Sequence, residues 1–269
     1  MVVPILVFRL PLRAFREEPS FTAAKRRMRD RRRSRVVTVW QAAQNEGRFE
    51  GRFEVKTDLC TRLVSFVGQK GGVGKSSLAR LLAVGAARKG QKVLLADFDL
   101  EQLTCLEWNA LRLRNNVEPE IDVRSFKSLK KLRKTEEAFD LIVADTRGLA
   151  DDLTKEVAEE SSTVFLPTGT SYDDLRPTLA LARRLAKHGA DGKLTFVLSK
   201  TGRSERQINL AAKQIEDNGF AVLDVSWAAR DGFQSEFDAG GVGLESRNRF
   251  LRDIADQMGR ALLERVFVG

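Results

Sequence analysis

Nine residues from Gly68 to Ser76, GQKGGVGKS, have the types and spacing of a phosphate-binding loop. They satisfy the pattern G-x-x-x-x-G-K-[S/T] at Gly68, Gly74, Lys75 and Ser76, between an apolar run and a helix-like run. Backbone N–H groups of such a loop surround phosphate oxygens, glycines supply positive φ angles, and the following helix N-terminus adds a favourable dipole. We therefore expect Lys75 to contact the β- and γ-phosphates of a nucleotide and the Ser76 hydroxyl to ligate Mg²⁺. The alternative is a glycine-rich turn that binds nothing, which the flanking strand and helix disfavour.

A second lysine, Lys70, lies five residues ahead of Lys75 in the same loop. The resulting form K-G-G-V-G-K-S resembles the deviant Walker A motif of the ParA/MinD family of ATPases, in particular its ParA-type partition ATPases. The resemblance implies that two protomers close face to face around two ATP molecules and that Lys70 reaches the partner's nucleotide. There a positioned cation would stabilise charge on the phosphoryl oxygens, so Lys70 and Lys75 are both catalytic candidates. By the same resemblance the nucleotide is bound by Gly68, Lys70, Gly71, Gly72, Val73, Gly74, Lys75, Ser76 and Ser77.

Two acidic segments extend the resemblance, which covers roughly residues 63–266. LLADFDLEQLT resembles the family's D-x-D-P-Q, which implies that Asp99 is catalytic and orients the attacking water, while Asp97 lies near the Mg²⁺. FDLIVADTRG resembles D-x-x-x-x-D-T-P-G and implies that Asp145 approaches the Mg²⁺ through water. ATP and Mg²⁺ are thus the implied cofactors, with Ser76, Asp97 and Asp145 around the metal. The alternative for Asp97 and Asp99 is a polar strand end without a chemical role.

The same segments depart from the family pattern. Leu100 replaces the usual proline, and Glu101 precedes Gln102, which leaves the role of that glutamine open. Arg147 stands where proline is usual. It either approaches a phosphate or is solvated, and we expect solvation.

Two later segments are also similar to the family. VLSKTGR resembles the place where the family contacts the adenine base, so Ser199 and Lys200 are nucleotide-binding candidates, although an ordinary strand-to-helix turn explains them equally well. PTGTSYDDLRPTLALARRL resembles a stretch in which an aspartate follows a P-x-x-x-S-like loop.

The two branches of the family imply different partners. The ParA branch binds nonspecific DNA as its ATP-bound dimer, whereas the MinD branch ends in an amphipathic membrane helix. The tail MGRALLERVFVG carries Glu264 and little cationic face, so we expect it to pack on the body and expect no membrane partner. A solvated helix face is the alternative for each of the DNA-binding candidates, which are Arg203, Arg206, Arg230, Arg247, Arg249 and Arg252.

The resemblance therefore implies an ATP-dependent dimerising switch that binds nonspecific DNA and partitions a plasmid or chromosome locus. Its ATP hydrolysis would be slow and stimulated by a ParB-like centromere-binding protein, in the cytoplasm at the nucleoid. Two alternatives remain: a MinD-like membrane-associated positioning ATPase, and a conjugation-accessory ParA-like DNA-binding protein with little turnover.

Alternating apolar and helical runs must position these residues. Apolar runs predict strands at 63–67, 92–99, 121–126, 139–146, 162–169 and 194–200, with a further short one at 221–227. Helices are predicted between them at 76–88, 104–113, 149–160, 175–187, 205–218 and 244–265. Strands that are apolar throughout and alternate with helices indicate an α/β fold of three layers, with a mostly parallel central sheet covered by helices on both faces. This is the architecture of P-loop NTPases, and its ligands bind at the carboxyl ends of the strands.

Charge divides the chain into two parts. Residues 1–60 hold 14 Lys and Arg against 7 Asp and Glu, a net charge of +7, whereas residues 61–269 hold 32 against 30, a net charge of +2. We expect residues 1–60 to be a basic, disordered extension, with a short helix near Val36–Gln44 and low-complexity sequence rather than a strand pair in GRFEGRFE. Attraction to phosphate backbones and an over-extended reading frame are alternatives for this part. Residues 61–269 are expected to form the ParA-like ATPase domain. Cys60 and Cys105 form no disulfide framework or metal cluster, which fits a reducing cytoplasm.

Overall fold

The computed structural model describes residues 35–39, 53–57, 61–148 and 151–268. The chain divides into two compact units, Met1–Cys60 and Thr61–Gly269. In the first unit, β1 (Arg35–Val39) pairs antiparallel with β2 (Phe53–Thr57). The helix expected near Val36–Gln44 is therefore wrong over its first four residues, where β-branched valines and a threonine favour a strand. Phe53 and Glu54, the last two residues of GRFEGRFE, begin β2. The rest of the expected helix and the rest of this repeat lie outside the described residues.

The second unit is built on an eight-stranded sheet in which every described pairing is parallel. The order is β10-β8-β7-β3-β6-β4-β5, and β9 also pairs with β8. The expected strand at 221–227 is split into two short ones, both on β8. The strands are β3 (Arg62–Phe66), β4 (Val93–Asp97), β5 (Asp122–Ser125), β6 (Leu141–Asp145), β7 (Thr163–Thr168), β8 (Leu194–Thr201), β9 (Ala221–Val222) and β10 (Trp227–Ala228).

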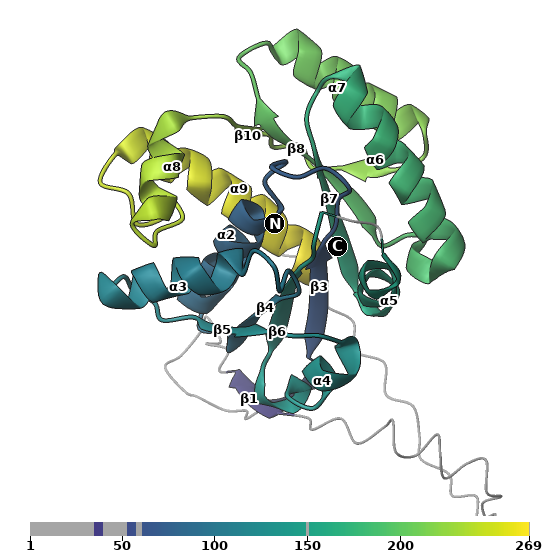
Figure 1. Ribbon diagram of the computed structural model, residues 1–269. Helices are drawn as coiled ribbons and strands as arrows, with labels where there is room; N and C mark the ends of the chain where they lie inside the picture. The colour runs from purple at the N-terminus through teal and green to yellow at the C-terminus, as the bar shows by residue number, and fades with distance from the viewer. Residues whose placement is uncertain (1–34, 40–52, 58–60, 149–150, 269) are drawn as a thin grey trace, which may run out of the picture. The chain divides into compact units, whose positions relative to one another are not determined.

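Helices cover both faces of this sheet (Figure 1), which confirms the three-layer α/β prediction. One face packs against α2, α3, α8 and α9, and the other against α4 to α7. The sequence predicted neither α4 nor α8, which are only five and eight residues long. The helices are α2 (Lys75–Arg88), α3 (Thr104–Arg114), α4 (Leu129–Arg133), α5 (Asp152–Glu160), α6 (Tyr172–Leu185), α7 (Glu205–Asp217), α8 (Asp231–Asp238) and α9 (Arg249–Phe267).

The C-terminal helix α9 packs on α2. Its buried residues include Met258 and Leu262, and the side chain of Leu263 lies beside Gly85 of α2. The tail is therefore part of the core, as the sequence predicted. Among the described residues, no helix has both the length and the apolar character needed to cross a membrane.

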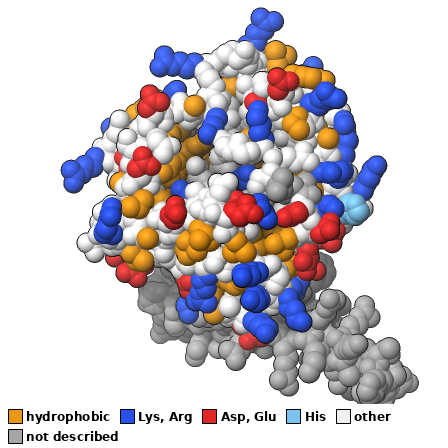
Figure 2. Space-filling model, in the orientation of Figure 1, with side chains coloured by type: hydrophobic (Ala, Val, Ile, Leu, Met, Phe, Trp, Pro, Cys, Tyr) orange, Lys and Arg blue, Asp and Glu red, His pale blue; other side chains and the backbone are white. Residues whose placement is uncertain are grey.

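Basic and acidic side chains are interspersed over much of the surface of this unit (Figure 2). This agrees with its nearly balanced charge of 32 Lys and Arg against 30 Asp and Glu. Any basic surface on the unit must therefore be local.

Candidate functional site

The glycine-rich loop connects the end of β3 to the start of α2. Gly72 and Gly74 have φ angles of 71° and 96°, in the left-handed region that side chains disfavour. The first turn of α2 has no side-chain cap and no acidic residue, so its N–H groups are available to an anion. A cavity of about 390 Å³ opens beside the loop. The loop residues that line it are Gly71, Gly72, Gly74, Lys75, Ser76 and Ser77.

Lys75 lies inside this cavity with 7% of its surface exposed. Its Nζ donates a hydrogen bond to the backbone carbonyl of Lys70 at 3.3 Å. Burial lowers the pKa of Lys75, and the nearby negative charges of Asp145 and Asp99 oppose that shift. Lys75 is thus an ammonium group held between a loop carbonyl and carboxylates.

Asp145, at the end of β6, is buried in the same cavity. Its Oδ2 accepts a hydrogen bond from the Cys105 thiol at 3.2 Å, whereas its buried Oδ1 has no hydrogen-bond partner among the described residues. Burial raises the pKa of Asp145, and the Ser76 hydroxyl, the Cys105 thiol and the charge of Lys75 lower it. A carboxylate oxygen without a partner beside a serine hydroxyl fits Mg²⁺, which binds one or two protein oxygens together with nucleotide phosphates. No cluster of three or more His, Cys, Asp or Glu among the described residues would hold a metal by itself.

Asp97 has a different environment from the one the sequence implied. It ends β4 opposite Asp145 in register, but it is fully buried and does not line the cavity. Its two carboxylate oxygens accept the backbone N–H groups of Asp99 and Cys105, each at 2.9 Å. Burial and the charge of Asp145 raise its pKa to about 6. Asp97 therefore holds both ends of the loop between β4 and α3, and it does not line the cavity.

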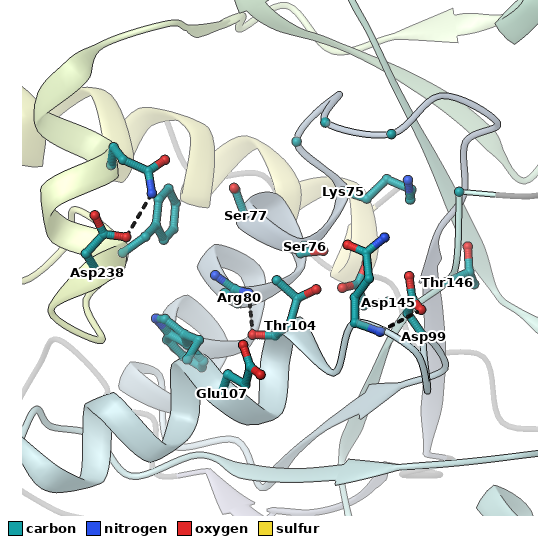
Figure 3. Close-up of a pocket in the computed structure, with 18 of the residues that line it drawn as sticks. Lys75, Ser76, Ser77, Arg80, Asp99, Thr104, Glu107, Asp145, Thr146 and Asp238 are labelled. Carbon is teal, nitrogen blue, oxygen red and sulfur yellow. Dashed lines mark hydrogen bonds between the residues drawn. The ribbon is translucent and has the colours of Figure 1, made fainter.

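Asp99, which that loop carries, does line the cavity. Its Oδ1 accepts the backbone N–H groups of Glu101 and Gln102 at 3.3 and 3.2 Å. Figure 3 shows Lys75, Ser76, Asp99 and Asp145 converging at one end of the cavity. The structure thus brings together most of the residues that the sequence assigned to phosphate and metal chemistry.

Two of the three departures from the family pattern, Glu101 and Arg147, contact each other. Arg147 Nη2 lies 2.7 Å from Glu101 Oε1, with side-chain exposures of 30% and 77%. Arg147 is therefore paired with a carboxylate rather than simply solvated. The pair joins the loop after β4 to the loop after β6, and Gly148 of the latter lies against the backbone of Gly71.

Lys70 differs from Lys75 in its exposure. Its side chain is 56% exposed, does not line the cavity, and forms an ion pair with Asp174 Oδ1 at 2.5 Å. The hydrogen bond and the charge of Asp174 raise the pKa of Lys70. Asp174 also accepts a hydrogen bond from Ser171, the N-cap of α6, at 2.7 Å. This aspartate belongs to the stretch PTGTSYDDLRPT, whose similarity to the family was the available signal for it.

Comparison with known proteins decides the family. The sequence profile described as CbiA, the CobQ/CobB/MinD/ParA nucleotide binding domain, matches residues 64–237. The chain belongs to this family. Its members of the ParA/MinD type are nucleotide-binding ATPases, as the loop geometry indicates.

Individual relatives are distant. Protein virC1 of Rhizobium radiobacter is 28% identical over 128 residues, 45% of this chain and 55% of VirC1, so about half the length of that relative is matched. Protein ParA of Rhizobium radiobacter is 23% identical over 186 residues, 66% of this chain and 83% of that protein.

Solved structures support the fold. A putative plasmid partition protein (BB_S35) from Borrelia burgdorferi B31, bound to AMPPNP, has a TM-score of 0.60 at 18% identity, covering 77% of this chain and 100% of that one. The cell division ATPase MinD of Pyrococcus furiosus has a TM-score of 0.57 at 19% identity, covering 76% of this chain and 98% of its own. These likenesses confirm a ParA/MinD-type P-loop fold for the chain.

The two candidates for base contact in this ParA/MinD-family protein lie in different places. Ser199 is buried, does not line the cavity, and donates a hydrogen bond to the carbonyl of Val73 in the loop. Lys200 lines the cavity and has a left-handed φ of 51°. Ser199 therefore supports the phosphate loop from behind, and only Lys200 faces the cavity.

The far wall of the cavity comes from residues that the sequence did not single out. Arg80 of α2 is 6% exposed, and its guanidinium lies 5.4 Å from the ring of Trp108 and 5.9 Å from that of Phe237. Its Nη2 donates to the carbonyl of Thr104 at 2.6 Å, while its buried Nε has no partner among the described residues. In the sequence, the one indication that Arg80 lies near the site is its position one helical turn after Ser76. The remaining members of this wall are Glu107, Leu111, Gln234 and Asp238.

The arginines proposed for DNA contact fall into two groups. The guanidinium carbon of Arg230, just before α8, lies 5.8 Å from the centre of the Phe250 ring. Phe250 is in the first turn of α9, which also carries Arg249 and Arg252. Arg249 lies 3.7 Å from Asp253, and Arg252 donates to the carbonyl of Ser246 at 3.2 Å. The second group precedes and enters α7, after β8. Its members are Arg203 and Arg206. Arg247, in the loop just before α9, lies beside the first group in sequence.

Proposed function

We propose that this ParA/MinD-family protein is an ATP-dependent dimerising switch that binds nonspecific DNA and partitions a plasmid or chromosome locus. It binds MgATP at Gly68–Ser77, closes face to face with a second copy, and binds DNA in the closed form. Slow hydrolysis, stimulated by a ParB-like centromere-binding protein, releases the DNA. The observation that carries the proposal is the contrast between the two loop lysines: Lys75 is buried in its own cavity, whereas Lys70 is exposed outside it.

The cavity residues take separate roles in this proposal. Lys75 binds the β- and γ-phosphate oxygens, and Asp99 orients the attacking water. Ser76 and Asp145 hold the Mg²⁺, which neutralises phosphate charge when it is bound. Lys70 leaves Asp174 and moves to the nucleotide of the partner. That exchange is inexpensive, because an ion pair with an exposed member contributes little to stability.

The remaining part of the cavity suits the nucleoside. Beyond Ser77 its wall carries two aromatic rings, Trp108 and Phe237, with Lys200 at another part of the lining. Trp108 is only 2% exposed and has the Arg80 guanidinium over its ring, which leaves the partly buried Phe237 as the aromatic contact for a base when its phosphates occupy the loop. We therefore assign the ribose and base to this end of the cavity.

DNA is favoured over a membrane as the partner. The apolar side of α9 packs on α2, so this helix does not offer it to a bilayer. Sequence similarity to Protein ParA supports the same choice. The candidate arginines Arg203, Arg206, Arg230, Arg247, Arg249 and Arg252 are proposed to contribute phosphate contacts.

A DNA-binding titration tests this proposal directly. Binding to random-sequence duplex DNA is measured with ATP, with ADP and without nucleotide, each at two salt concentrations, and binding to anionic vesicles is measured in parallel. We expect DNA binding that requires ATP and weakens steeply with salt. Binding to vesicles alone would overturn the partition function in favour of a membrane-associated ATPase.

Size-exclusion chromatography tests the role of Lys70. Lys70→Ala is expected to bind ATP but to remain monomeric with it, because the cation for the partner's nucleotide is gone. Lys75→Ala is the matched control and should lose nucleotide binding itself. An ATP-induced dimer of Lys70→Ala would contradict the proposed contact in trans.

A further inference from the structure

The short helix α4 carries a concentration of positive charge that the proposed function has not used. Residues 126–134, FKSLKKLRK, contain five basic residues and no acidic one, in a unit whose charge is otherwise nearly balanced. All five basic side chains are exposed. They form what we call the α4 basic cluster: Lys127, Lys130, Lys131, Arg133 and Lys134.

The packing of α4 on the core turns the side chains of this cluster toward solvent. Leu129 and Leu132 are 2% and 1% exposed and join Phe126 in the core between α4, α5 and the sheet. Because these leucines are three residues apart, they occupy one side of the helix and leave Lys130 and Lys131 on the outside. Figure 2 shows Lys and Arg side chains gathered over α4, at the lower end of that view. The cluster is therefore presented on a helix that is anchored to the core.

One ion pair among the described residues joins the cluster to a carboxylate. Arg133 forms an ion pair with Glu160 of α5. Among the described residues, none of the four lysines forms an ion pair. Like charges this close repel one another, and a polyanion would relieve that repulsion.

We infer that the α4 basic cluster is a DNA-backbone contact surface of this protein, an inference that rests on the proposed DNA-binding function. Double-stranded DNA carries one negative charge per roughly 1.7 Å of its axis, so a compact cluster of lysines meets several phosphates at once. A membrane is a poorer match: interfacial helices insert apolar side chains, and here Phe126, Leu129 and Leu132 are all buried.

This surface is separate from the candidate arginines on α9. The α4 helix packs on the same face of the sheet as α5, whereas α9, with Arg249 and Arg252, packs on the opposite face with α2. Substitutions in the cluster can therefore be made without touching either the nucleotide cavity or the α9 arginines.

A charge-matched pair of variants tests the inference. Lys130→Gln, Lys131→Gln and Lys134→Gln are combined in one protein. The control combines Lys89→Gln, Lys187→Gln and Lys213→Gln, three exposed lysines elsewhere with the same reduction in charge. Binding of each full-length protein to random-sequence duplex DNA is measured with ATP across a salt series. Binding to anionic vesicles, ATP hydrolysis and ATP-dependent dimerisation are measured in parallel.

We expect the α4 variant to bind DNA at least tenfold more weakly than the control. The slope of log K against log salt should fall by about 0.9 for each phosphate that the variant no longer neutralises, so by up to about three, with hydrolysis and dimerisation unchanged. Equal DNA binding by the α4 variant and the control would overturn the inference while leaving the proposed function standing. Failure of the unsubstituted protein to bind DNA with any nucleotide would overturn both. Weaker binding to anionic vesicles, with DNA binding intact, would make lipid the occupant and overturn the inference as stated.

Discussion

Three carboxylates near the ends of β4 and β6 have different roles in spite of their proximity. Asp145 faces the cavity with an oxygen that has no partner among the described residues, Asp99 faces it from a loop, and Asp97 is turned inward to hold that loop. Burial determines the difference, because a fully buried carboxylate must receive hydrogen bonds from the protein itself. Of the three, Asp99 is the one available to orient a water molecule.

Asp99→Asn should therefore separate turnover from binding. The amide oxygen can still accept the N–H groups of Glu101 and Gln102, so the loop keeps its turn, but the charge that polarises water is removed. We expect ATP hydrolysis to fall by about 100-fold or more with ATP affinity nearly unchanged. Single-turnover hydrolysis and nucleotide titration measure the two effects. An unchanged hydrolysis rate would leave Asp99 without its proposed role and would favour an accessory protein with little turnover.

The raised pKa of Asp97 predicts that the stability of the folded protein depends on pH. Its pKa rises from 3.8 to about 6 on folding, so the folded protein binds this proton more tightly than the unfolded chain. The resulting stabilisation is present below about pH 4 and is lost as pH rises through about 6. It amounts to up to about 3 kcal/mol, from roughly 1.4 kcal/mol per pKa unit.

Comparison with Asp97→Asn isolates this contribution. In urea unfolding without nucleotide and with a chelator, the unsubstituted protein should lose stability relative to the variant between pH 4 and 6. The hydrogen bond that asparagine cannot accept adds a constant offset, because it does not titrate. Parallel stability curves for the two proteins over this range would refute the assignment.

At the scale of elements, the cavity depends on how closely its surrounding segments approach one another. The loop after α8 packs on the end of α3: the buried Arg112 donates to the carbonyl of Gly240 at 2.9 Å and pairs with Glu245 at 2.9 Å. Glu245 in turn accepts the N–H of Val242 at 3.0 Å. This contact holds α8, and with it Phe237 of the cavity wall, against α3.

Gly240→Ala should therefore be strongly destabilising. Gly240 has a φ of 83°, and an added Cβ would lie 2.4 Å from the backbone nitrogen of Arg112. We expect a decrease of roughly 2–4 kcal/mol in unfolding free energy, since backbone overlap adds to the left-handed strain. Gly219→Ala is the control: its φ is 80°, nothing lies within 4 Å, and it should cost only about 1–2 kcal/mol. Equal decreases for the two variants would show that α8 does not depend on this close approach.

At the scale of the whole molecule, the two compact units suggest a division of labour. The cavity and the core that surrounds it are composed of residues in Thr61–Gly269. Residues 1–60 carry a net charge of +7 from 14 Lys and Arg against 7 Asp and Glu. Their contribution should be electrostatic rather than catalytic.

A protein limited to residues 61–269 should therefore fold and hydrolyse ATP as the full chain does. Its affinity for DNA should fall, with a shallower salt dependence, because up to seven net positive charges are removed. Circular dichroism, ATPase assays and DNA titration measure these properties. Failure of the shortened protein to fold would show that residues 1–60 are part of the structural core.

The sequence by itself predicted the phosphate loop, the parallel sheet and its main helices. These depend on local patterns: glycine spacing, apolar runs, and helix periods set by neighbouring residues. The inward turn of Asp97, the support of the loop by Ser199 and the pairing of Arg147 with Glu101 were not predicted. They depend on which groups meet across the carboxyl edge of the sheet.

Tertiary structure alone also decided where the two loop lysines point and what forms the far wall of the cavity. Lys70 and Asp174 are 104 residues apart in the chain, and Arg80 and Phe237 are more distant still. No local pattern records such contacts, because they arise only when the sheet order brings the ends of β3, β4, β6 and β7 together. The sequence determined what chemistry the loop could support, and packing decided which side chains remain available to perform it.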